Sequence, residues 1–220
     1  MRERLMNFNY VDMHLMKAEV PLVSKVKFYP NEDEKKWANE IRKTMEGNLV
    51  VLVPNGSSVT KMWPHAVEFS KSLLARKNLT LIMLGDDRSM NFGELEDHKR
   101  FMKIGTNWNV RQAMTFCQLA DVVIGQETGL LNCVSDEESV HKIVLFTHSS
   151  VENLTRDWPN TTSVRKLPAC AGNTGCHRLH YDWQFCEQDE ETKAAKCQAM
   201  ISASEMVDKV FEVLDEVQKN

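Results

Sequence analysis

The sequence predicts an α/β domain in which helices cover both faces of a parallel sheet. Three observations support this prediction, and all of them hold between about residues 48 and 147. Several runs of strand length are almost continuously apolar, as strands buried on both faces must be. Segments with apolar residues at helical spacing alternate with these runs, and the turns between them are short. Such an alternation favours right-handed crossovers between parallel strands.

The predicted elements follow from these patterns in order along the chain. Leu49–Val53 is the first apolar run, and Leu79–Leu84 is the second. Pro64 suits the first turn of a helix, because its missing N–H would have no partner there. The strands are predicted at 49–53, 79–84, 121–124 and 142–146, and the helices at 64–76, 94–103, 109–118 and 128–136.

The two flanks of this region differ from it. Residues 1–47 are predicted to be an extension or linker, with no clear period over 1–28 and a helix over 30–45. The remaining residues, 48–220, form the predicted domain. Within it, 148–200 is irregular and includes a Cys-rich segment at 165–200, and an amphipathic helix of about 18 residues closes the chain.

Composition excludes several classes of function. The chain has 220 residues, a formal net charge of −4 and no dense block of Lys and Arg, which argues against a nucleic-acid partner. No apolar run approaches the ~18 residues that a membrane span needs. The first residues, Met1–Phe8, lack the apolar stretch of a secretory signal, so we expect a cytoplasmic protein.

Two strand–turn–helix corners are the candidate site. Gly125–Asn132 follows the apolar run 120–124, and Pro54–Lys61 follows 49–53. A turn that opens a helix leaves backbone N–H groups unpaired, and such groups bind phosphate. The two corners therefore predict a nucleoside diphosphate at the carboxyl edge of the sheet.

The motifs at these corners resemble those in the C-terminal half of the family 9 glycosyltransferases, the ADP-heptose:lipopolysaccharide heptosyltransferases and their relatives. The resemblance covers residues 28–218. It rests on the order and spacing of four motifs, which are Pro54-Asn55-Gly56-Ser57-Ser58 with Lys61-Met62-Trp63-Pro64, Leu84-Gly85-Asp86-Asp87, Gly125-Gln126-Glu127-Thr128-Gly129-Leu130-Leu131-Asn132, and Leu145-Phe146-Thr147-His148-Ser149-Ser150.

The resemblance implies a Rossmann-like parallel sheet, similar to the C-terminal domain of the GT-B arrangement. In that arrangement two such domains face each other, and the C-terminal one holds the nucleotide-sugar donor. The N-terminal domain carries the acceptor site and an Asp that acts as base. Residues 1–47 are too short for a domain of about 100 residues, so we expect another domain or a second chain to supply that half.

At the first corner, the resemblance places Ser57, Ser58 and Lys61 on the donor diphosphate. Lys61 would be the catalytic residue, because an ammonium group offsets the charge of a departing nucleoside diphosphate. The alternative is an ordinary loop in which a Ser caps the next helix.

At the second corner, the family usually has Asp-Thr-Gly, with a His three residues after the Gly. Here Glu127 replaces the Asp and Asn132 stands at the His position. Thr128 and Gly129 still offer a hydroxyl and N–H groups to a phosphate. Glu127 could bond to a turn N–H, orient Lys61 or contact sugar hydroxyls. The alternative is a purely structural helix N-cap.

Two further residues complete the predicted donor site. Asp87 ends the second strand and could accept hydrogen bonds from ribose hydroxyls, although a solvated turn explains it equally well. Trp108 could stack on a base, although a role in the core is the stronger interpretation. A hydrolase based on His148 and Ser149 is not supported, because there is no Gly-x-Ser-x-Gly motif.

The cysteines divide into two groups. Cys117 and Cys133 lie in apolar helical contexts and are predicted to be buried thiols. The other four lie in the irregular segment, where they could bind a structural zinc ion, form disulfides or remain free. These four are Cys170, Cys176, Cys186 and Cys197.

The resemblance thus implies the donor-binding domain of a glycosyltransferase. It also implies an ADP-heptose-like nucleotide-sugar as ligand and a bacterial glycan such as lipopolysaccharide as acceptor. The alternative is a non-catalytic nucleotide-sugar-binding or scaffold domain that lacks the acceptor half. A structural domain in which the phosphate corners are vestigial is a further alternative.

Overall fold

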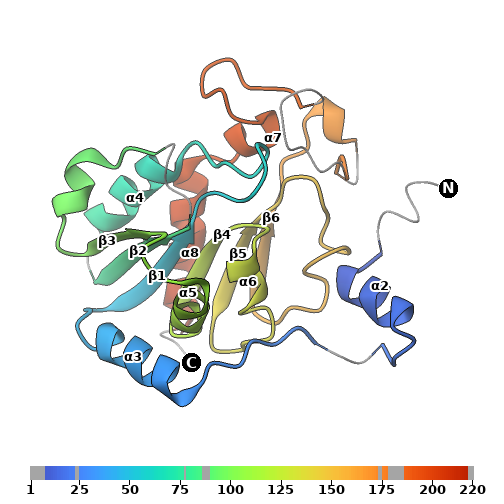
Figure 1. The fold of residues 1–220 in the computed structure, drawn as a ribbon. Coiled ribbons are helices and arrows are strands. Elements are labelled where there is room, and N and C mark those ends of the chain that lie inside the picture. Colours follow the sequence, from blue (N-terminus) through green and yellow to red (C-terminus); the bar gives the residue numbers. More distant parts are fainter. Residues whose placement is uncertain are drawn as a thin grey trace.

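A computed structural model describes residues 8–22, 25–76, 78–85, 90–172, 175–177 and 186–217 of the chain. In this part a six-stranded sheet has the order β3-β2-β1-β4-β5-β6, and all of its pairs are parallel (Figure 1). The predicted α/β class and the four predicted strands are therefore confirmed. The strands are β1 Asn48–Val53, β2 Leu79–Leu84, β3 Phe101–Gly105, β4 Val122–Gln126, β5 His141–Leu145 and β6 Thr161–Val164.

The central strands β1 and β4 approach each other closely because of a glycine. A Cβ atom on Gly125 would lie 2.3 Å from the carbonyl oxygen of Val53. Only a residue without a side chain fits there, so Gly125 fixes the spacing at the centre of the sheet. The second to sixth residues of β1 and all residues of β4 are buried.

Helices cover both faces of the sheet, as Figure 1 shows. α4 (Ala66–Ala75) and α8 (Ala203–Val217) pack together over one face, and α3 (Glu32–Arg42) and α5 (Val110–Cys117) pack over the other. Asn31 and Asn109 begin α3 and α5 with capping boxes, which give partners to N–H groups of the first turns.

The predicted helix over 94–103 is wrong. A short 3₁₀ helix, η1 (Gly93–Asp97), is followed by strand β3, which pairs with β2. Phe101 packs on Phe92, with the ring centroids 5.1 Å apart. Pairing with a neighbouring strand outweighs the helical spacing of this segment, which sequence periodicity alone does not reveal.

The flanks also contain structure that the sequence did not predict. β6 lies within the segment expected to be irregular. Three of its four residues are polar, so it lacks the apolar run of a buried strand. The remaining short elements of this segment are η2 (Ala169–Ala171) and α7 (Lys196–Ala199), near the carboxyl ends of the strands in Figure 1.

The N-terminal flank contains α2 (Tyr10–Lys17), where no periodicity was recognised. Figure 1 shows α2 beyond the β5–β6 end of the sheet. The N–H of Tyr10 donates to the carbonyl of Asn153 at 2.8 Å, and the Asn153 amide donates to the carbonyl of Phe8 at 2.8 Å. Asn9 caps the helix by accepting from two N–H groups of its first turn. Among the described residues, no helix is both long and apolar enough to cross a membrane.

Candidate functional site

Both predicted corners leave the sheet at its topological switch point. The strand order is 3-2-1-4-5-6, so the chain progresses outward in opposite directions from the adjacent pair β1 and β4. Loops that diverge from such a pair leave a crevice outside the carboxyl ends of the strands, where ligands bind in open α/β folds. This topology supports the predicted location independently of any motif.

Lys61 joins the two corners. Its Nζ donates to the backbone carbonyl of Glu127 at 2.7 Å and lies 4.0 Å from Oε2 of the same residue. The Lys61 side chain lies across Gly56, where an added Cβ would be 2.8 Å from its Cβ and Cδ. Burial lowers the pKa of Lys61, and the charge of Glu127 opposes part of that shift.

The carboxylate of Glu127 is buried among polar groups of the residues that follow β5. Oε1 accepts from the N–H of Thr147 at 3.0 Å, and Oε2 lies 3.2 Å from Nδ1 of His148. The Thr147 hydroxyl lies 2.9 Å from the same Nδ1. Of the roles considered for Glu127, the bond to a turn N–H is confirmed, and its position beside Lys61 suits the orienting role.

The N-terminal helix lies close enough to be influenced by this carboxylate. Burial raises the pKa of Tyr10, and the negative charge of Glu127 raises it further. Tyr10 therefore lies near the β4 corner, although 117 positions separate it from Glu127 in the sequence.

Thr128 has a buried hydroxyl oxygen with no hydrogen-bond partner among the described residues. It stands at the N-cap of α6 (Gly129–Asn132), but its side chain makes no capping bond. Thr128 thus occupies the N-cap position that the structural alternative gave it, but without a side-chain capping bond. Gly129 is exposed and Asn132 is partly exposed, so both are accessible from outside the turn.

The hydroxyls of the β1 corner are used differently. Ser58 is buried, and its Oγ pairs with the hydroxyl of Thr60 at 2.9 Å, whereas Ser57 is exposed. The N-cap of α4 is His65, which makes no side-chain capping bond. The alternative in which a Ser caps this helix is therefore wrong. Asp87, the predicted ribose ligand, lies outside the described residues.

Sequence reasoning missed the supporting role of Thr147. The signal was a hydroxyl residue directly after the predicted strand 142–146. Trp108 packs edge-on against Trp37 with ring centroids 4.9 Å apart and contacts Phe116 at the same centroid distance. Its role in the core is thus confirmed.

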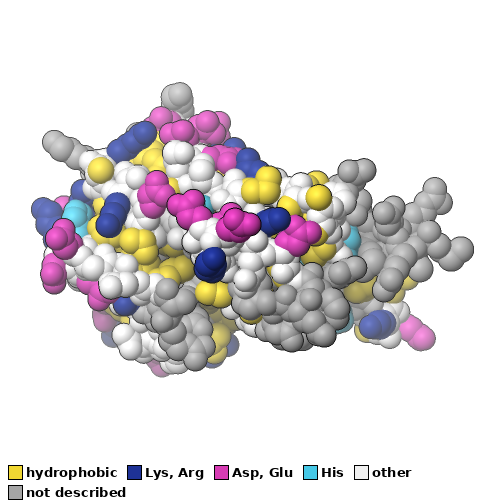
Figure 2. Space-filling view, turned by 90° about the horizontal axis from the view of Figure 1, so that it is seen from above, with side chains coloured by type: hydrophobic (Ala, Val, Ile, Leu, Met, Phe, Trp, Pro, Cys, Tyr) yellow, Lys and Arg dark blue, Asp and Glu magenta, His cyan; other side chains and the backbone are white. Residues whose placement is uncertain are grey.

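The carboxyl edge of the sheet, with the loops of both corners, faces the viewer in Figure 2. Acidic and basic side chains are interspersed on this face.

The four clustered cysteines line one small cavity of about 40 Å³, next to Thr147 and His148. None of the four forms a disulfide with another described residue, and burial raises the pKa of Cys186 to about 11 and that of Cys197 to about 12. Among the described residues, no three His, Cys, Asp or Glu side chains lie at metal-binding spacing. The zinc site therefore stays a prediction. Cys117 and Cys133 are buried free thiols, as predicted.

Sequence comparisons give no relatives: no protein-family model matches the chain, and no curated protein matches it significantly. Comparison with solved structures, in contrast, finds similar folds. The chain is similar to ADP-heptose LPS heptosyltransferase II from Escherichia coli, with a TM-score of 0.66, 12% identity and 91% of the chain covered. It is also similar to a family 9 glycosyl transferase from Veillonella parvula, with a TM-score of 0.68, 12% identity and 95% covered.

The chain shares the fold of the family 9 glycosyltransferases. A third structure, the dodecameric iron-containing heptosyltransferase TibC in complex with ADP-D-beta-D-heptose, has a TM-score of 0.55 at 12% identity over 80% of the chain. The matches span 57%, 60% and 48% of the three structures, so the chain corresponds to only part of each. At this identity the likeness is one of fold.

Proposed function

We propose that this chain binds the diphosphate of a nucleotide-sugar and is the donor-binding domain of a glycosyltransferase. One observation carries the proposal: Lys61 bridges the two loops that diverge at the switch point, with its Nζ 2.7 Å from the Glu127 carbonyl. A buried cation at this position in an open α/β sheet suits an anionic ligand.

The ammonium of Lys61 has three donors, and the Glu127 carbonyl takes one of them. A remaining donor is directed to a phosphate oxygen in this proposal, and the Thr128 hydroxyl, which lacks a partner among the described residues, donates to another. Ser57 and the N–H of Gly129 add contacts from the exposed side of the two turns. Ser58 supports the first turn through Thr60, while Asp87 and Asn132 are assigned to ribose or sugar hydroxyls.

In the proposed reaction, the bond between the anomeric carbon and the diphosphate oxygen breaks, and its electron pair stays on the diphosphate. Lys61 offsets the charge that develops there. The acceptor oxygen forms the new glycosidic bond, and its proton passes to a base. We assign that base to another domain or a second chain. An ADP-heptose-like donor, a bacterial glycan or lipopolysaccharide acceptor and a cytoplasmic setting complete the proposal.

The alternative is a nucleotide-sugar-binding or scaffold domain without catalysis. Transfer that is detected only after a second polypeptide is added would favour the enzyme. Binding without transfer under those conditions would favour the scaffold.

Thermal stability in the presence of ADP, UDP, GDP and CDP tests the proposal. A ligand that binds only the folded state raises the free energy of unfolding by RT ln(1 + [L]/Kd), so the effective nucleotide raises Tm in a concentration-dependent way. Lys61→Met should abolish that rise. Lys142→Met is the matched control, because Lys142 is a buried lysine at the other edge of the sheet and should not affect binding.

If no nucleotide raises Tm at millimolar concentration, the proposed donor site is refuted. Equal loss of the rise in both lysine variants would also contradict it, because that result would trace the effect to general destabilisation rather than to the switch point.

The proposal includes a structural metal ion at Cys170, Cys176, Cys186 and Cys197. It is supported by the convergence of these four thiols on one cavity, and it requires them to move to coordination distance. Binding would release protons, because the pKa values of Cys186 and Cys197 lie well above 7. Elemental analysis of the purified protein should find stoichiometric zinc or iron, lost in Cys197→Ser but kept in Cys117→Ser. Metal-free protein from zinc- and iron-supplemented cultures would contradict the site.

A further inference from the structure

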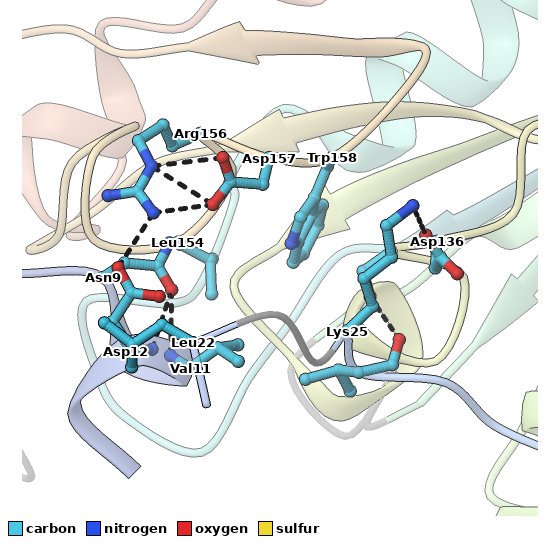
Figure 3. A pocket seen from close by; sticks show the side chains of 12 residues that line it. Asn9, Val11, Asp12, Leu22, Lys25, Asp136, Leu154, Arg156, Asp157 and Trp158 are labelled. Atoms are coloured by element: carbon cyan, nitrogen blue, oxygen red, sulfur yellow. Dashed lines mark hydrogen bonds and ion pairs between the residues drawn. The ribbon is translucent and has the colours of Figure 1, made fainter. Parts of the chain in front are cut away.

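A second cavity, of about 270 Å³, lies between the N-terminal segment and the loops that flank β5. Asp12 of α2 and Lys25 contribute from the N-terminal side. Asp136, which follows α6, and the stretch Arg156–Trp158 before β6 contribute from the domain (Figure 3). The cavity is therefore built by segments that are more than 100 positions apart in sequence. None of its residues belongs to the proposed diphosphate site.

The charged groups in this cavity neutralise one another. Lys25 Nζ lies 2.6 Å from Oδ1 of Asp136. Arg156 bridges two carboxylates, at 2.9 Å from Asp12 and 2.8 Å from Asp157. The two cations thus already have carboxylate partners, and three carboxylates stand against two cations. Such a lining does not attract a phosphate, and it is too polar for an apolar ligand.

Trp158 stands between these two groups of ion pairs, as Figure 3 shows. Its side chain is partly buried against the core over the α3 and α5 face of the sheet. Leu154 and Leu22 add apolar surface to the same cavity. An aromatic face with hydrogen-bonding groups on both sides of it is therefore the main feature of the lining.

We infer that this cavity binds a neutral sugar. The C–H bonds of a pyranose ring carry partial positive charge and pack against the negative face of an indole. Its hydroxyls both donate and accept, so they suit carboxylates on one side and a guanidinium or ammonium on the other. The volume of the cavity is just below the usual range for drug-sized ligands, which fits a single sugar ring or the end of a glycan.

The inference does not rest on the proposed donor site, although the two places are neighbours. Tyr10 lies near Glu127, while the adjacent residues Asn9, Val11 and Asp12 line the cavity. A sugar held here would thus lie next to the helix that reaches the β4 corner. Binding is expected in the absence of any nucleotide, so failure of the donor site would leave this inference intact.

Saturation-transfer NMR with the full chain tests the inference, using glucose, galactose, mannose, N-acetylglucosamine and lactose at about 20 mM, since weak sugar binding lies in the millimolar range. Transfer to ring C–H protons of one of these sugars is the expected result. Trp158→Ala should weaken that sugar at least about tenfold, the scale of losing an aromatic contact, whereas Trp158→Phe should retain binding. Tyr29→Ala is the matched control, because Tyr29 is 72% exposed and lies outside the cavity.

Asp136→Asn provides an independent variant that preserves size. It frees the ammonium of Lys25, so sugar binding should weaken while inorganic phosphate binding appears. The inference is overturned if none of the five sugars shows transfer, or if transfer is unchanged in Trp158→Ala. It is also overturned if inorganic phosphate displaces the sugar from the wild-type protein, because the cavity would then be an anion site.

Discussion

Lys61 and Lys142 are buried at opposite edges of the same sheet and make similar hydrogen bonds. Lys61 follows β1 and donates to the carbonyl of Glu127 at 2.7 Å, and Lys142, near the start of β5, donates to the carbonyl of Glu137 at 2.8 Å. Burial lowers the pKa of both, that of Lys142 to about 8. Their surroundings differ. Lys61 has the Glu127 carboxylate at 4.0 Å, whereas no described carboxylate forms an ion pair with Lys142.

A buried lysine with a shifted pKa therefore does not by itself identify a binding site. Lys61 lies at the carboxyl edge, between diverging loops, and the adjoining turn holds the Thr128 hydroxyl, which has no hydrogen-bond partner in the part of the chain that the structure describes. Lys142 lies at the amino edge, where it donates to the Glu137 carbonyl and the nearby charges of Glu137, Asp136 and Glu138 oppose part of its pKa shift. Topology and neighbouring polar groups distinguish the two, and each of the following predictions tests one part of that distinction.

The largest effect is expected from Glu127→Ala. This change leaves the Lys61 ammonium and the Thr147 N–H buried without their acidic partner, so the free energy of unfolding should fall by about 3–5 kcal/mol. Urea unfolding monitored by circular dichroism measures it. Glu137→Ala is the matched change at Lys142. It keeps the carbonyl that Lys142 uses and removes a side chain bonded to Gln118 at 3.1 Å, so about 1 kcal/mol should be lost.

The distinction between the lysines fails if the two alanine variants lose the same free energy. Glu127→Gln separates charge from shape, because the amide oxygen can still accept from Thr147. The Gln variant should recover part of the lost free energy of unfolding, but it cannot restore the ion pair with Lys61. Full recovery would show that hydrogen bonding alone stabilises this corner.

The next effect is a pH dependence that arises from Lys142. The folded state binds its proton less tightly than the unfolded chain, in which the pKa has its ordinary value of 10.5. Between pH 8 and 10.5 the unfolded chain therefore holds more protons, and the free energy of unfolding rises with pH across this window. The rise from this group is about 3 kcal/mol, at about 1.4 kcal/mol per pKa unit.

Lys142→Met should remove this rise, so the stability difference between variant and wild type should change by that amount from pH 8 to 10.5. The difference cancels contributions from tyrosines and thiols that titrate in the same range. Denaturant unfolding at several pH values measures it. Lys61→Met should show a change of the same sign. A difference that stays constant with pH for Lys142→Met would mean that this lysine titrates normally in the folded protein.

Much of the sheet could be predicted from the sequence because its central strands are buried on both faces. Leu49–Val53 and Leu79–Leu84 are continuous apolar runs, which are typical of strands covered on both faces. Both strands lie where they were predicted. The edge strands β3 and β6 lack this signal. Thr161–Val164 has one apolar residue in four, and its identity as a strand depends on pairing with β5. Pairing of this kind is tertiary information that local periodicity does not contain.

The location of the site could also be predicted, but its internal partners could not. The two turns are recognisable because each follows a buried strand. The sequence does not show that β1 and β4 are neighbours, and that adjacency brings Lys61 to Glu127 across 66 positions. It also does not show that Ser58 pairs with Thr60 while Ser57 stays exposed. These partners depend on how each turn closes.

The smallest effect on stability is expected from Gly56→Ala, which should displace the Lys61 side chain and leave Lys142 in place. The added Cβ would lie 2.8 Å from Cβ and Cδ of Lys61, so the flexible side chain must shift. We expect a loss of about 1 kcal/mol, because a side chain yields more easily than a backbone. Nucleotide-dependent stabilisation should fall much more, since Nζ leaves its place between the two corners. Gly129→Ala is the contrast, with Met114 Cε as the nearest atom at 3.8 Å, and it should leave Lys61 in place. If Gly56→Ala retains full nucleotide stabilisation, the position of the Lys61 side chain is not what holds the ligand.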